Sequence, residues 1–365
     1  MNFSVKSIFI TIVDFGHHFF MIIRLIVCGF LGGLMANAET SIPDVEDPAL
    51  GLPSIELPEP SFFNKSIIKL GEKLFFDPFL SRDGTISCAT CHVPDQGFAE
   101  NGKRLSTGID GKIGLRNAPT LLNIAYAESM FVDGREDTLE GQAWQPILAH
   151  DEMGNTDVKE VLQRLGKSKS YAKLFKKSFT QDGLTKKNLA VALSAYQRTL
   201  VSGNSAYDKW YYEGQDDAMN ESAERGYQLF AGQAQCWQCH SIAGPGVLFS
   251  DNLFHNTGVS HRSKKKGLTE DLGRYQFTKL EYDKRSFKTP TLRNIAETSP
   301  YMHDGSLSSL EDVVRFYNEG GSDDPLLSPI IGTLNLSDGD INDLVEFLKS
   351  LSGDHKFEQE KLDKL

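Results

Sequence analysis

Two short stretches decide the fold: CATCH at Cys88–His92 and CWQCH at Cys236–His240. Each reads C-x-x-C-H, which is the attachment signature of a c-type haem. Two thiols separated by two residues can reach the two vinyl groups of one porphyrin, and the next residue places an imidazole on the iron. The sequence therefore predicts two covalently bound haem c groups, each held by two cysteines and one histidine: Cys88, Cys91 and His92, then Cys236, Cys239 and His240.

The same four cysteines have competing interpretations, namely two disulfides in an exported protein, a thioredoxin-like redox pair, or a shared four-thiolate zinc site. A redox pair needs no histidine after it and normally opens a helix after a strand, and neither motif follows a β-branched run. A shared zinc site would have to join two pairs that lie far apart in the sequence. The motif therefore favours haem over each alternative.

The sequence around the motifs is duplicated. Gly71–Phe75 precedes the first motif and Gly226–Phe230 precedes the second. Downstream, Ala118–Ala125 (APTLLNIA) aligns without a gap with Thr289–Ala296 (TPTLRNIA), and both contain Pro-Thr-Leu. The same offset in residue number relates two shorter pairs, Asp133-Gly134 with Asp304-Gly305 and Leu139-Glu140 with Leu310-Glu311. The chain is thus a tandem duplication of one haem-binding unit.

The readable periodicity is helical. From Leu310 to Tyr317, apolar residues recur at i, i+3, i+4 and i+7, and Ser308 with Glu311 forms a capping box that would begin this helix. Two more helices are expected over Lys187–Leu200 and Leu334–Leu351, the latter with Ser337 as a cap. Few segments alternate as strands do. The predicted fold class is all-α, with two tandem cytochrome c-like domains, each around one covalently bound haem.

The chain divides into five predicted segments. A basic-then-apolar run ends in Ala36-Asn37-Ala38, which has the shape of a signal-peptidase site. Its apolar part is too short for a comfortable membrane span, so we expect a periplasmic protein that is not embedded in the membrane. The segments are a signal peptide with an upstream extension (1–38), a proline-rich extended arm (39–60), the N-terminal domain (61–205), the C-terminal domain (206–352) and a tail (353–365).

The overall charge argues against some partners. The chain of 365 residues has 38 Lys+Arg and 49 Asp+Glu, for a net charge of −11, so nucleic acid and anionic lipid are poor candidates. The basic run Lys264–Lys266 lies in the stretch 250–285, where it is either a solvated loop or a docking patch for an acidic partner.

The function depends on what lies opposite each iron. In the first half, Gln142 and Glu152 follow the Asp-Gly turn. A carboxyl group near an open haem can move a proton between the oxygens of peroxide, although a lone glutamate here can equally be a surface carboxylate. In the second half, Tyr317 lies on the apolar face of its helix, either as a core tyrosine or as a phenolate ligand of iron.

With these motifs in place, the sequence resembles the bacterial di-haem cytochrome c peroxidase family, in particular its MauG/MbnH-like branch. The resemblance covers about residues 60–350. It rests on both haem motifs and on further stretches spread over both halves: Asn117–Thr120, Asp133–Arg135, Gln142 to Glu152, Pro290–Asn294 and Pro300–Gly305.

The resemblance implies a role for each matching residue. His92 would be the proximal ligand of a peroxide-reacting haem, with Glu152 as acid–base catalyst and Gln142 beside it. His240 would be proximal on an electron-transfer haem. A calcium ion between the domains would take an asparagine side chain and two backbone carbonyls, and the matching positions are Asn117, Thr298 and Pro300.

Three positions bear on the branch within the family. Classical members carry a histidine eight residues before the Asn-Ala-Pro asparagine that blocks the resting iron; Ile109 stands there. They also place methionine sixteen residues after the position of Tyr301, where this chain has Tyr317. Both differences resemble MauG. The family's tryptophan between the haems is replaced by Val132, for which Trp144 or another aromatic residue could substitute.

Three hypotheses follow. The first is a periplasmic enzyme that reacts with hydrogen peroxide at the N-terminal haem and oxidises a partner protein through the C-terminal haem. The second is a peroxidase that detoxifies peroxide with electrons from a small cytochrome or cupredoxin. The third is a di-haem cytochrome without catalysis. For the first, the exposed aromatics Trp210, Tyr211 and Tyr212 are candidate exit points, although a packed inter-domain role is the alternative.

Overall fold

The structure is a computed structural model that describes residues 48–244 and 246–355, all of which lie within one compact unit of the chain, residues 40–365. The predicted signal peptide, the first residues of the arm and residues 356–365 of the predicted tail lie outside the described residues.

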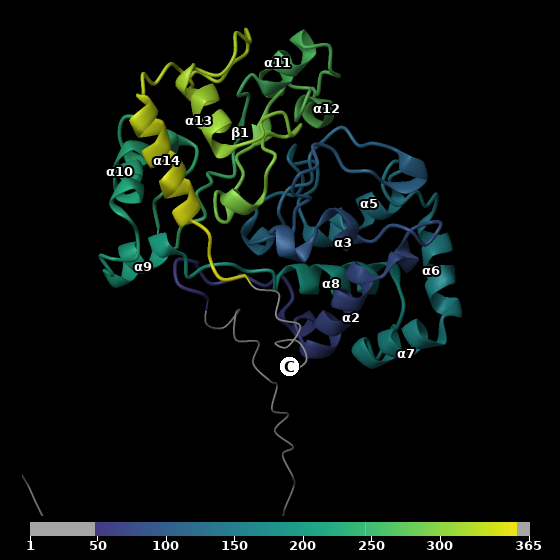
Figure 1. The fold of residues 1–365 in the computed structure, drawn as a ribbon. Helices are drawn as coiled ribbons and strands as arrows, with labels where there is room; N and C mark the ends of the chain where they lie inside the picture. Colours follow the sequence, from purple (N-terminus) through teal and green to yellow (C-terminus); the bar gives the residue numbers. More distant parts are fainter. Residues whose placement is uncertain (1–47, 245, 356–365) are drawn as a thin grey trace, which may run out of the picture. The chain divides into compact units, whose positions relative to one another are not determined.

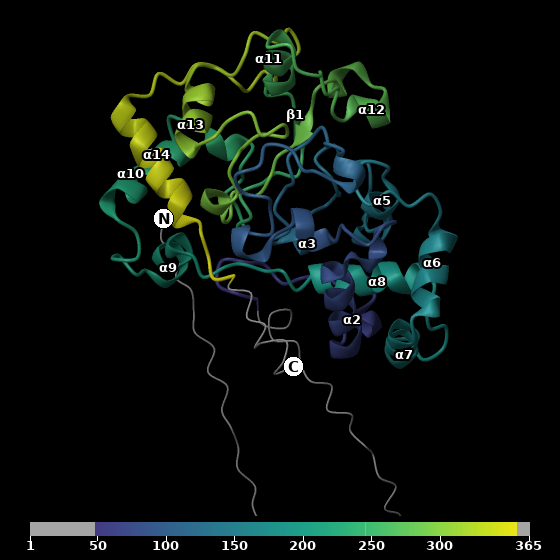
Figure 2. The same cartoon turned by 45° about the vertical axis from the view of Figure 1, so that its right-hand side comes forward.

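The first half is built from helices, with 3-10 turns between them (Figure 1). Its central pair is α2 against α8, which lie side by side in both views (Figures 1 and 2). A β-carbon on Gly71 of α2 would lie 1.8 Å from the carbonyl oxygen of Ala192, so only glycine permits this approach. The helices of this half are α2 (Lys65–Phe76), α3 (Cys88–Cys91), α4 (Leu139–Gln142), α5 (Trp144–Leu148), α6 (Val158–Lys167), α7 (Lys169–Ser178) and α8 (Lys186–Gln197).

The second half repeats this pairing with α10 against α14 (Figure 2). Here a β-carbon on Gly226 would lie 2.0 Å from the carbonyl oxygen of Asp343. The duplicated sequence therefore produces the same glycine-mediated helix contact twice. The helices of this half are α9 (Ala206–Glu213), α10 (Glu221–Ala231), α11 (Val259–Lys265), α12 (Tyr275–Thr278), α13 (Leu310–Asn318) and α14 (Asp338–Ser350).

Short 3-10 turns and one small sheet complete the described part of the chain. The sheet pairs β1 (Phe254–His255) with β2 (Phe287–Lys288) in antiparallel register, with Phe254 opposite Lys288. The 3-10 turns are η1 (Pro60–Phe62), η2 (Pro78–Leu80), η3 (Pro94–Gln96), η4 (Ile109–Gly111), η5 (Ile124–Tyr126), η6 (Cys236–Gln238), η7 (Glu281–Asp283) and η8 (Ile295–Glu297).

Each half has its own hydrophobic core. One cluster of buried side chains runs from Ile67 to Leu200, and a second runs from Tyr207 to Leu351. The two clusters share no residue, so the all-α prediction of two tandem units holds. The predicted boundary between residues 205 and 206 agrees with this division but stays a prediction.

Two predicted helix caps can be compared with the structure. Ser337 caps α14 as expected, since its side chain accepts a hydrogen bond from the Asp340 amide at 3.2 Å. The predicted position of the α13 capping box is wrong by one residue, because Ser309 and Asp312 form the box rather than Ser308 and Glu311. Both serines precede an acidic residue at i+3, so the local pattern fits two registers.

The described part of the predicted arm, residues 48–59, has no helix or strand, but it is not extended throughout, because the chain turns at Leu50–Gly51 and bends at Pro58–Glu59. It packs onto both halves. The Gly51 carbonyl accepts hydrogen bonds from the Val247 amide and from the Arg293 guanidinium, at 2.9 and 2.6 Å. The Tyr126 hydroxyl donates to the Pro53 carbonyl at 2.9 Å. The arm, which precedes the first half in the sequence, therefore binds both halves by hydrogen bonds.

Within the described residues, no helix combines the length and the apolar character that crossing a membrane would require.

Candidate active site and haem pockets

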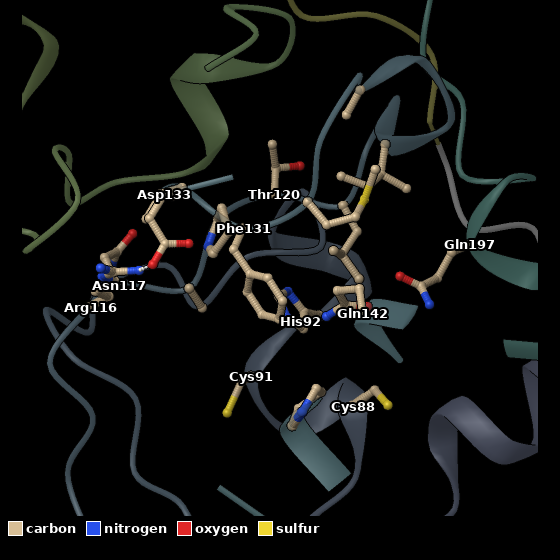
Figure 3. Close-up of a pocket in the computed structure, with 18 of the residues that line it drawn as sticks. Cys88, Cys91, His92, Arg116, Asn117, Thr120, Phe131, Asp133, Gln142 and Gln197 are labelled. Atoms are coloured by element: carbon tan, nitrogen blue, oxygen red, sulfur yellow. Dashed lines mark hydrogen bonds and ion pairs between the residues drawn. The ribbon is translucent and has the colours of Figure 1, made fainter. Parts of the chain in front are cut away.

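A cavity of about 760 Å³ contains the first C-x-x-C-H motif (Figure 3). Cys88 and Cys91 lie along one edge of it, whereas Arg116 and Asp133 lie to one side and Gln197 to the opposite side. Residues of both halves of the chain line the cavity. Its second-half lining includes Leu248, Ser250, Asn252, Asp271, Phe277, Lys288 and Thr289.

The two motif histidines are oriented in the same way. His92 Nδ1 lies 3.1 Å from the Phe98 carbonyl oxygen, and His240 Nδ1 lies 2.8 Å from that of Phe249. Both phenylalanines have a left-handed backbone, with φ of 51° and 53°. When Nδ1–H donates to a carbonyl, Nε2 keeps its lone pair for a metal. Burial lowers the pKa of both histidines, which favours the neutral, ligating form.

The aligned segments Ala118–Ala125 and Thr289–Ala296, which we call the straps, make equivalent hydrogen bonds in the two halves. The Thr120 hydroxyl donates to the Gly97 carbonyl at 2.6 Å, and the Thr291 hydroxyl donates to the Leu248 carbonyl at 2.7 Å. Each accepting carbonyl belongs to the residue just before the phenylalanine that binds the histidine. The Pro-Thr-Leu repeat seen in the sequence thus fixes the loop that orients each imidazole.

The four cysteines of the two motifs form no disulfide with one another. Burial raises their pKa to about 12 for Cys88 and Cys236 and to about 11 for Cys91 and Cys239, the opposite of an activated redox thiolate. Among residues 48–244 and 246–355, no cluster brings both cysteine pairs together. Disulfides, a redox pair and a shared zinc site are therefore disfavoured, and thioether attachment fits the chemistry of all four.

One other group of possible metal ligands occurs in the described part of the chain. It consists of Cys239, Asp251 and His255, with His255 Nε2 2.9 Å from an Asp251 carboxylate oxygen. Its only sulfur ligand is a thiol of the second haem motif, so the group adds no separate site.

Gln142 and Glu152 both line the cavity, as the sequence predicts for a distal pair. Gln142 is the last residue of α4, and Glu152 follows α5. The Glu152 side chain is exposed, but toward the cavity that it lines. The surrounding protein raises its pKa by desolvation, Asp151 adds to this, and Arg135 opposes it. A carboxyl group with a raised pKa is suited to accepting and returning a proton near neutral pH.

Ile109 does not line this cavity. Its side chain is only 1% exposed and packs against Gly154, while its amide donates to the Glu152 carbonyl at 2.8 Å. An aliphatic side chain cannot ligate iron. Nothing at this position can therefore block a metal held by His92.

Tyr317 lies on α13 close to the second motif. Its pKa is raised by burial and by the nearby Cys239 and Cys236 thiols, and it is lowered in part by a hydrogen bond with Thr257. The neutral phenol is thus favoured in the absence of a metal. The side chain is only partly buried, which differs from a tyrosine packed wholly in the core.

The calcium candidates come from both halves: Asn117 from the first, Thr298 and Pro300 from the second. The Asn117 amide nitrogen donates to the Lys103 and Arg104 carbonyls at 3.0 and 3.2 Å, which leaves Oδ1 available. Within the described residues, the carbonyls of Thr298 and Pro300 accept no hydrogen bond. Three oxygens without partners are the ligand type that calcium prefers, so the donor set fits the ion.

Sequence reasoning missed a charged network at the same interface. Arg116 binds Asp133 of the first half at 2.7 Å and Asp271 of the second half at 2.6 Å. Burial acts to raise the pKa of Asp271, but hydrogen bonds and charge from Arg116 lower it overall. A lone arginine before Asn117 carries no sequence signal for a partner in the other half of the chain.

Trp144 does not replace the inter-haem tryptophan. It is buried in the first core, its indole N–H donates to the Lys186 carbonyl at 3.2 Å, and it does not line the cavity. The suggestion made for it from sequence is not supported. Val132 does line the cavity. In the second half, the Phe287 ring stacks on His303 at 3.7 Å and contacts the Arg116 guanidinium.

The other candidate surface features have structural roles. Trp210 and Tyr212 on α9 pack against the second core, whereas Tyr211 is 48% exposed and stacks on Tyr207. Their ring contacts lie within the second half, and an exit point at Tyr211 stays a hypothesis. The basic run lies on and just after α11 rather than in a loop. Lys264 pairs with Glu270 at 2.6 Å and Lys265 pairs with Asp323, which reduces the free positive charge.

Two helical units, each with an oriented histidine beside a pair of thiols, define a di-haem c-type protein, and its first motif lines a large cavity. Comparisons with known proteins agree. Residues 65–217 match the family model of di-haem cytochrome c peroxidases, and residues 223–352 match that of cytochrome c.

Individual relatives cover most of the chain. The methylamine utilization protein MauG of Methylorubrum extorquens is 39% identical over 308 residues, 82% of each protein. Cytochrome-c peroxidase IdrP1 of Denitromonas iodatirespirans is 36% identical over 343 residues, 86% of this chain and 89% of that protein. The crystal structure of a MauG-like protein associated with microbial copper homeostasis superposes with a TM-score of 0.74 at 30% identity, covering 84% of this chain and 95% of that one.

The chain belongs to the di-haem cytochrome c peroxidase family. It is an oxidoreductase of the peroxidase type with two tandem cytochrome c-like domains, as predicted. Family membership favours the two enzymatic hypotheses over a cytochrome without catalysis.

Proposed function

We propose that this chain is a periplasmic, MauG-like enzyme that reduces hydrogen peroxide in the first half and draws the electrons from a partner protein through the second half. The balance is one peroxide, two protons and two electrons for two waters, with the partner protein oxidised by two electrons. The observation that carries the proposal is Ile109, a buried aliphatic residue directly beside Glu152. It leaves the metal position of the first half accessible without prior reduction.

The haem groups would be held by the residues that the motifs predict. Cys88 and Cys91 would form the first pair of thioethers and Cys236 and Cys239 the second, with His92 and His240 as proximal ligands through Nε2. Tyr317 would be the second protein ligand of the C-terminal iron, which requires its phenol to lose a proton. When bound, the iron supplies the redox chemistry that peroxide reduction requires.

Glu152 and Gln142 would handle the substrate. Glu152, with its pKa raised by burial, would take a proton from one peroxide oxygen and return it to the other as the bond between them breaks. Gln142 carries both an amide donor and a carbonyl acceptor, so it can orient peroxide or water in the same cavity. Arg135 opposes the rise in the Glu152 pKa and would help to keep that carboxylate in its ionised form.

A calcium ion would link the halves through Asn117 Oδ1 and the carbonyls of Thr298 and Pro300. It would hold the loop before the His303-Asp304-Gly305 turn against the strap of the first half.

The electrons would enter near the second motif. Trp237, between Cys236 and Cys239, is 46% exposed, so an aromatic ring lies at the surface beside the predicted thioethers. A partner protein docking there would need no path through the first half.

The test is to add hydrogen peroxide to the haem-loaded, fully oxidised protein without any reductant. We expect a resting spectrum with one high-spin and one low-spin component, and an immediate change on adding peroxide. A protein that ignores peroxide until it has been reduced by one electron would contradict the proposal.

A second candidate function is peroxide detoxification with a small electron-donor protein. The 36% identity to a protein named cytochrome-c peroxidase favours it. Sustained turnover with a reduced cytochrome c or cupredoxin would support this candidate over oxidation of a partner protein.

A further inference from the structure

The two halves exchange a matched pair of hydrogen bonds across their interface. The Asn117 amide donates to the His303 carbonyl at 2.8 Å, and the Lys288 amide donates to the Val132 carbonyl at 2.7 Å. The sequence repeat that aligns Ala118 with Thr289 also aligns Asn117 with Lys288 and Val132 with His303. Each bond is therefore the repeat-related copy of the other, and the interface has an approximate two-fold relation here.

The side chains of Asn117 and Lys288 differ in chemistry, but the backbone carbonyls assigned to them are repeat-related copies. On one side, Asn117 Oδ1 and the carbonyl of Pro300 are the oxygens available for a cation. On the other side, the Lys288 ammonium donates to the carbonyl of Ser129. Ser129 is the repeat-related copy of Pro300, at the same offset in residue number. A lysine nitrogen thus binds the carbonyl that corresponds to a proposed calcium ligand.

We propose that the Lys288 ammonium substitutes for a calcium ion. Calcium would bind at Asn117 in one half, and the Lys288 side chain would supply the positive charge at the repeat-related position in the other half. The inference rests on the calcium site proposed above, and it adds a second cation site that needs no ion from solution. Asn117 and Lys288 both line the large cavity, so the two cations would face it from equivalent positions of the two halves.

Burial and the neighbouring carboxylates act in opposite directions on the charge of Lys288. Its side chain is partly buried, and Asp133 and Glu128 lie near enough to favour the charged form, although neither forms an ion pair with it among the described residues. Burial lowers the Lys288 pKa to about 8, against the pull of these two carboxylates. The lysine is therefore still mostly charged at pH 7, and its remaining two N–H donors stay available within the cavity wall.

Calcium content of the haem-loaded protein tests this directly. We would compare the wild type with Lys288→Asn, which restores the Asn117 pattern, and with Lys279→Asn, an exposed lysine on the same half. After equilibration with calcium and gel filtration, we expect one additional bound calcium per chain in Lys288→Asn and none in Lys279→Asn. An equal calcium content in Lys288→Asn and the wild type would overturn the inference.

Two further measurements keep the result interpretable. Lys288→Met removes the charge and cannot bind calcium, so we expect its unfolding temperature to fall by several degrees with or without a chelator; an unchanged temperature would also count against the inference. If Lys288→Asn folds poorly, calcium in the growth medium should restore its yield but not that of Lys288→Met.

Asn117→Ala separates the two sites: a variant that keeps the calcium content of the wild type would refute the Asn117 site, whereas the Lys288→Met result does not depend on it.

Discussion

The backbone amide of Ile109 donates a hydrogen bond to the carbonyl oxygen of Glu152 at 2.8 Å. Ile109, which we propose leaves the first iron without a blocking ligand, is thus hydrogen-bonded to Glu152, the residue proposed for proton transfer. Gly108, the residue before Ile109, packs against the residue before Glu152, since a β-carbon on Gly108 would lie 2.1 Å from the Asp151 carbonyl oxygen. The two segments pack closely and share a backbone hydrogen bond, and Glu152, on one of them, lines the cavity.

We expect Glu152→Gln to slow the reaction with peroxide by roughly 10²- to 10⁴-fold, the range for a positioned acid–base group. The amide keeps the size of the side chain but cannot accept and return a proton. Stopped-flow spectroscopy of the oxidised, haem-loaded variant measures the rate. Glu160→Gln, an exposed glutamate on α6, is the matched control and should react like the wild type. Equal rates in both variants would remove Glu152 from the mechanism.

We expect Tyr317→Phe to replace the low-spin signal of the C-terminal haem by a different ligation state, because only the hydroxyl is lost. Electron paramagnetic resonance and optical spectra of the oxidised protein measure this. The control is Tyr212→Phe, in which the lost hydroxyl is buried in the same core without a partner. Spectra of Tyr317→Phe that match the wild type would show that Tyr317 is a packing residue only.

Much of the fold was predictable because its determinants are local or repeated. The haem motifs fix two pairs of thiols within five residues each, and the repeat identifies the straps that orient His92 and His240. Gln142 and Glu152 could be assigned to one cavity through the family resemblance, and both line it.

The parts that could not be predicted depend on contacts between distant segments. Arg116 meets Asp271, and Lys288 meets Ser129, only because the two halves pack together. No local pattern records such pairs. The shift of the α13 cap from Ser308 to Ser309 has a different cause, since the sequence carries two overlapping capping-box patterns and the local pattern does not distinguish them.

The helix crossings make a stability prediction for both halves. Gly71→Ala and Gly226→Ala should each destabilise the protein by about 1–3 kcal/mol, the usual cost of overpacking, because the new methyl group would collide with a backbone carbonyl of the partner helix. Guanidinium unfolding of the haem-loaded variants measures the change. Gly332→Ala is the control, since no atom lies within 4 Å of the place that its new methyl group would take. A loss in Gly332→Ala equal to that in the other two variants would contradict the crossing argument.

The end of the described chain carries a pH-sensitive ion pair. His355 Nε2 lies 2.8 Å from the Glu297 carboxylate, with side chains 16% and 30% exposed. The hydrogen bond to Glu297 raises the pKa of His355 above 6.5. Burial acts to raise the pKa of Glu297, but the hydrogen bond and charge of His355 outweigh it and lower the pKa below 4.5.

The sign of the pH dependence follows from these two directions. The histidine contributes stability that is fully present below pH 6.5 and is lost as the pH rises through its raised pKa. The glutamate contributes stability that is present above pH 4.5 and is lost as the pH falls through its lowered pKa. Replacing His355 by Gln should therefore cost up to about 1 kcal/mol near pH 5.5 and much less at pH 9, as measured by guanidinium unfolding at both values.

Lys349→Gln breaks the Lys349–Glu346 pair, which contains no histidine, and should show no such difference between the two pH values. A His355→Gln cost that is the same at pH 5.5 and pH 9 would mean that the pair does not anchor the chain end, because the charged histidine would then add nothing to the folded state.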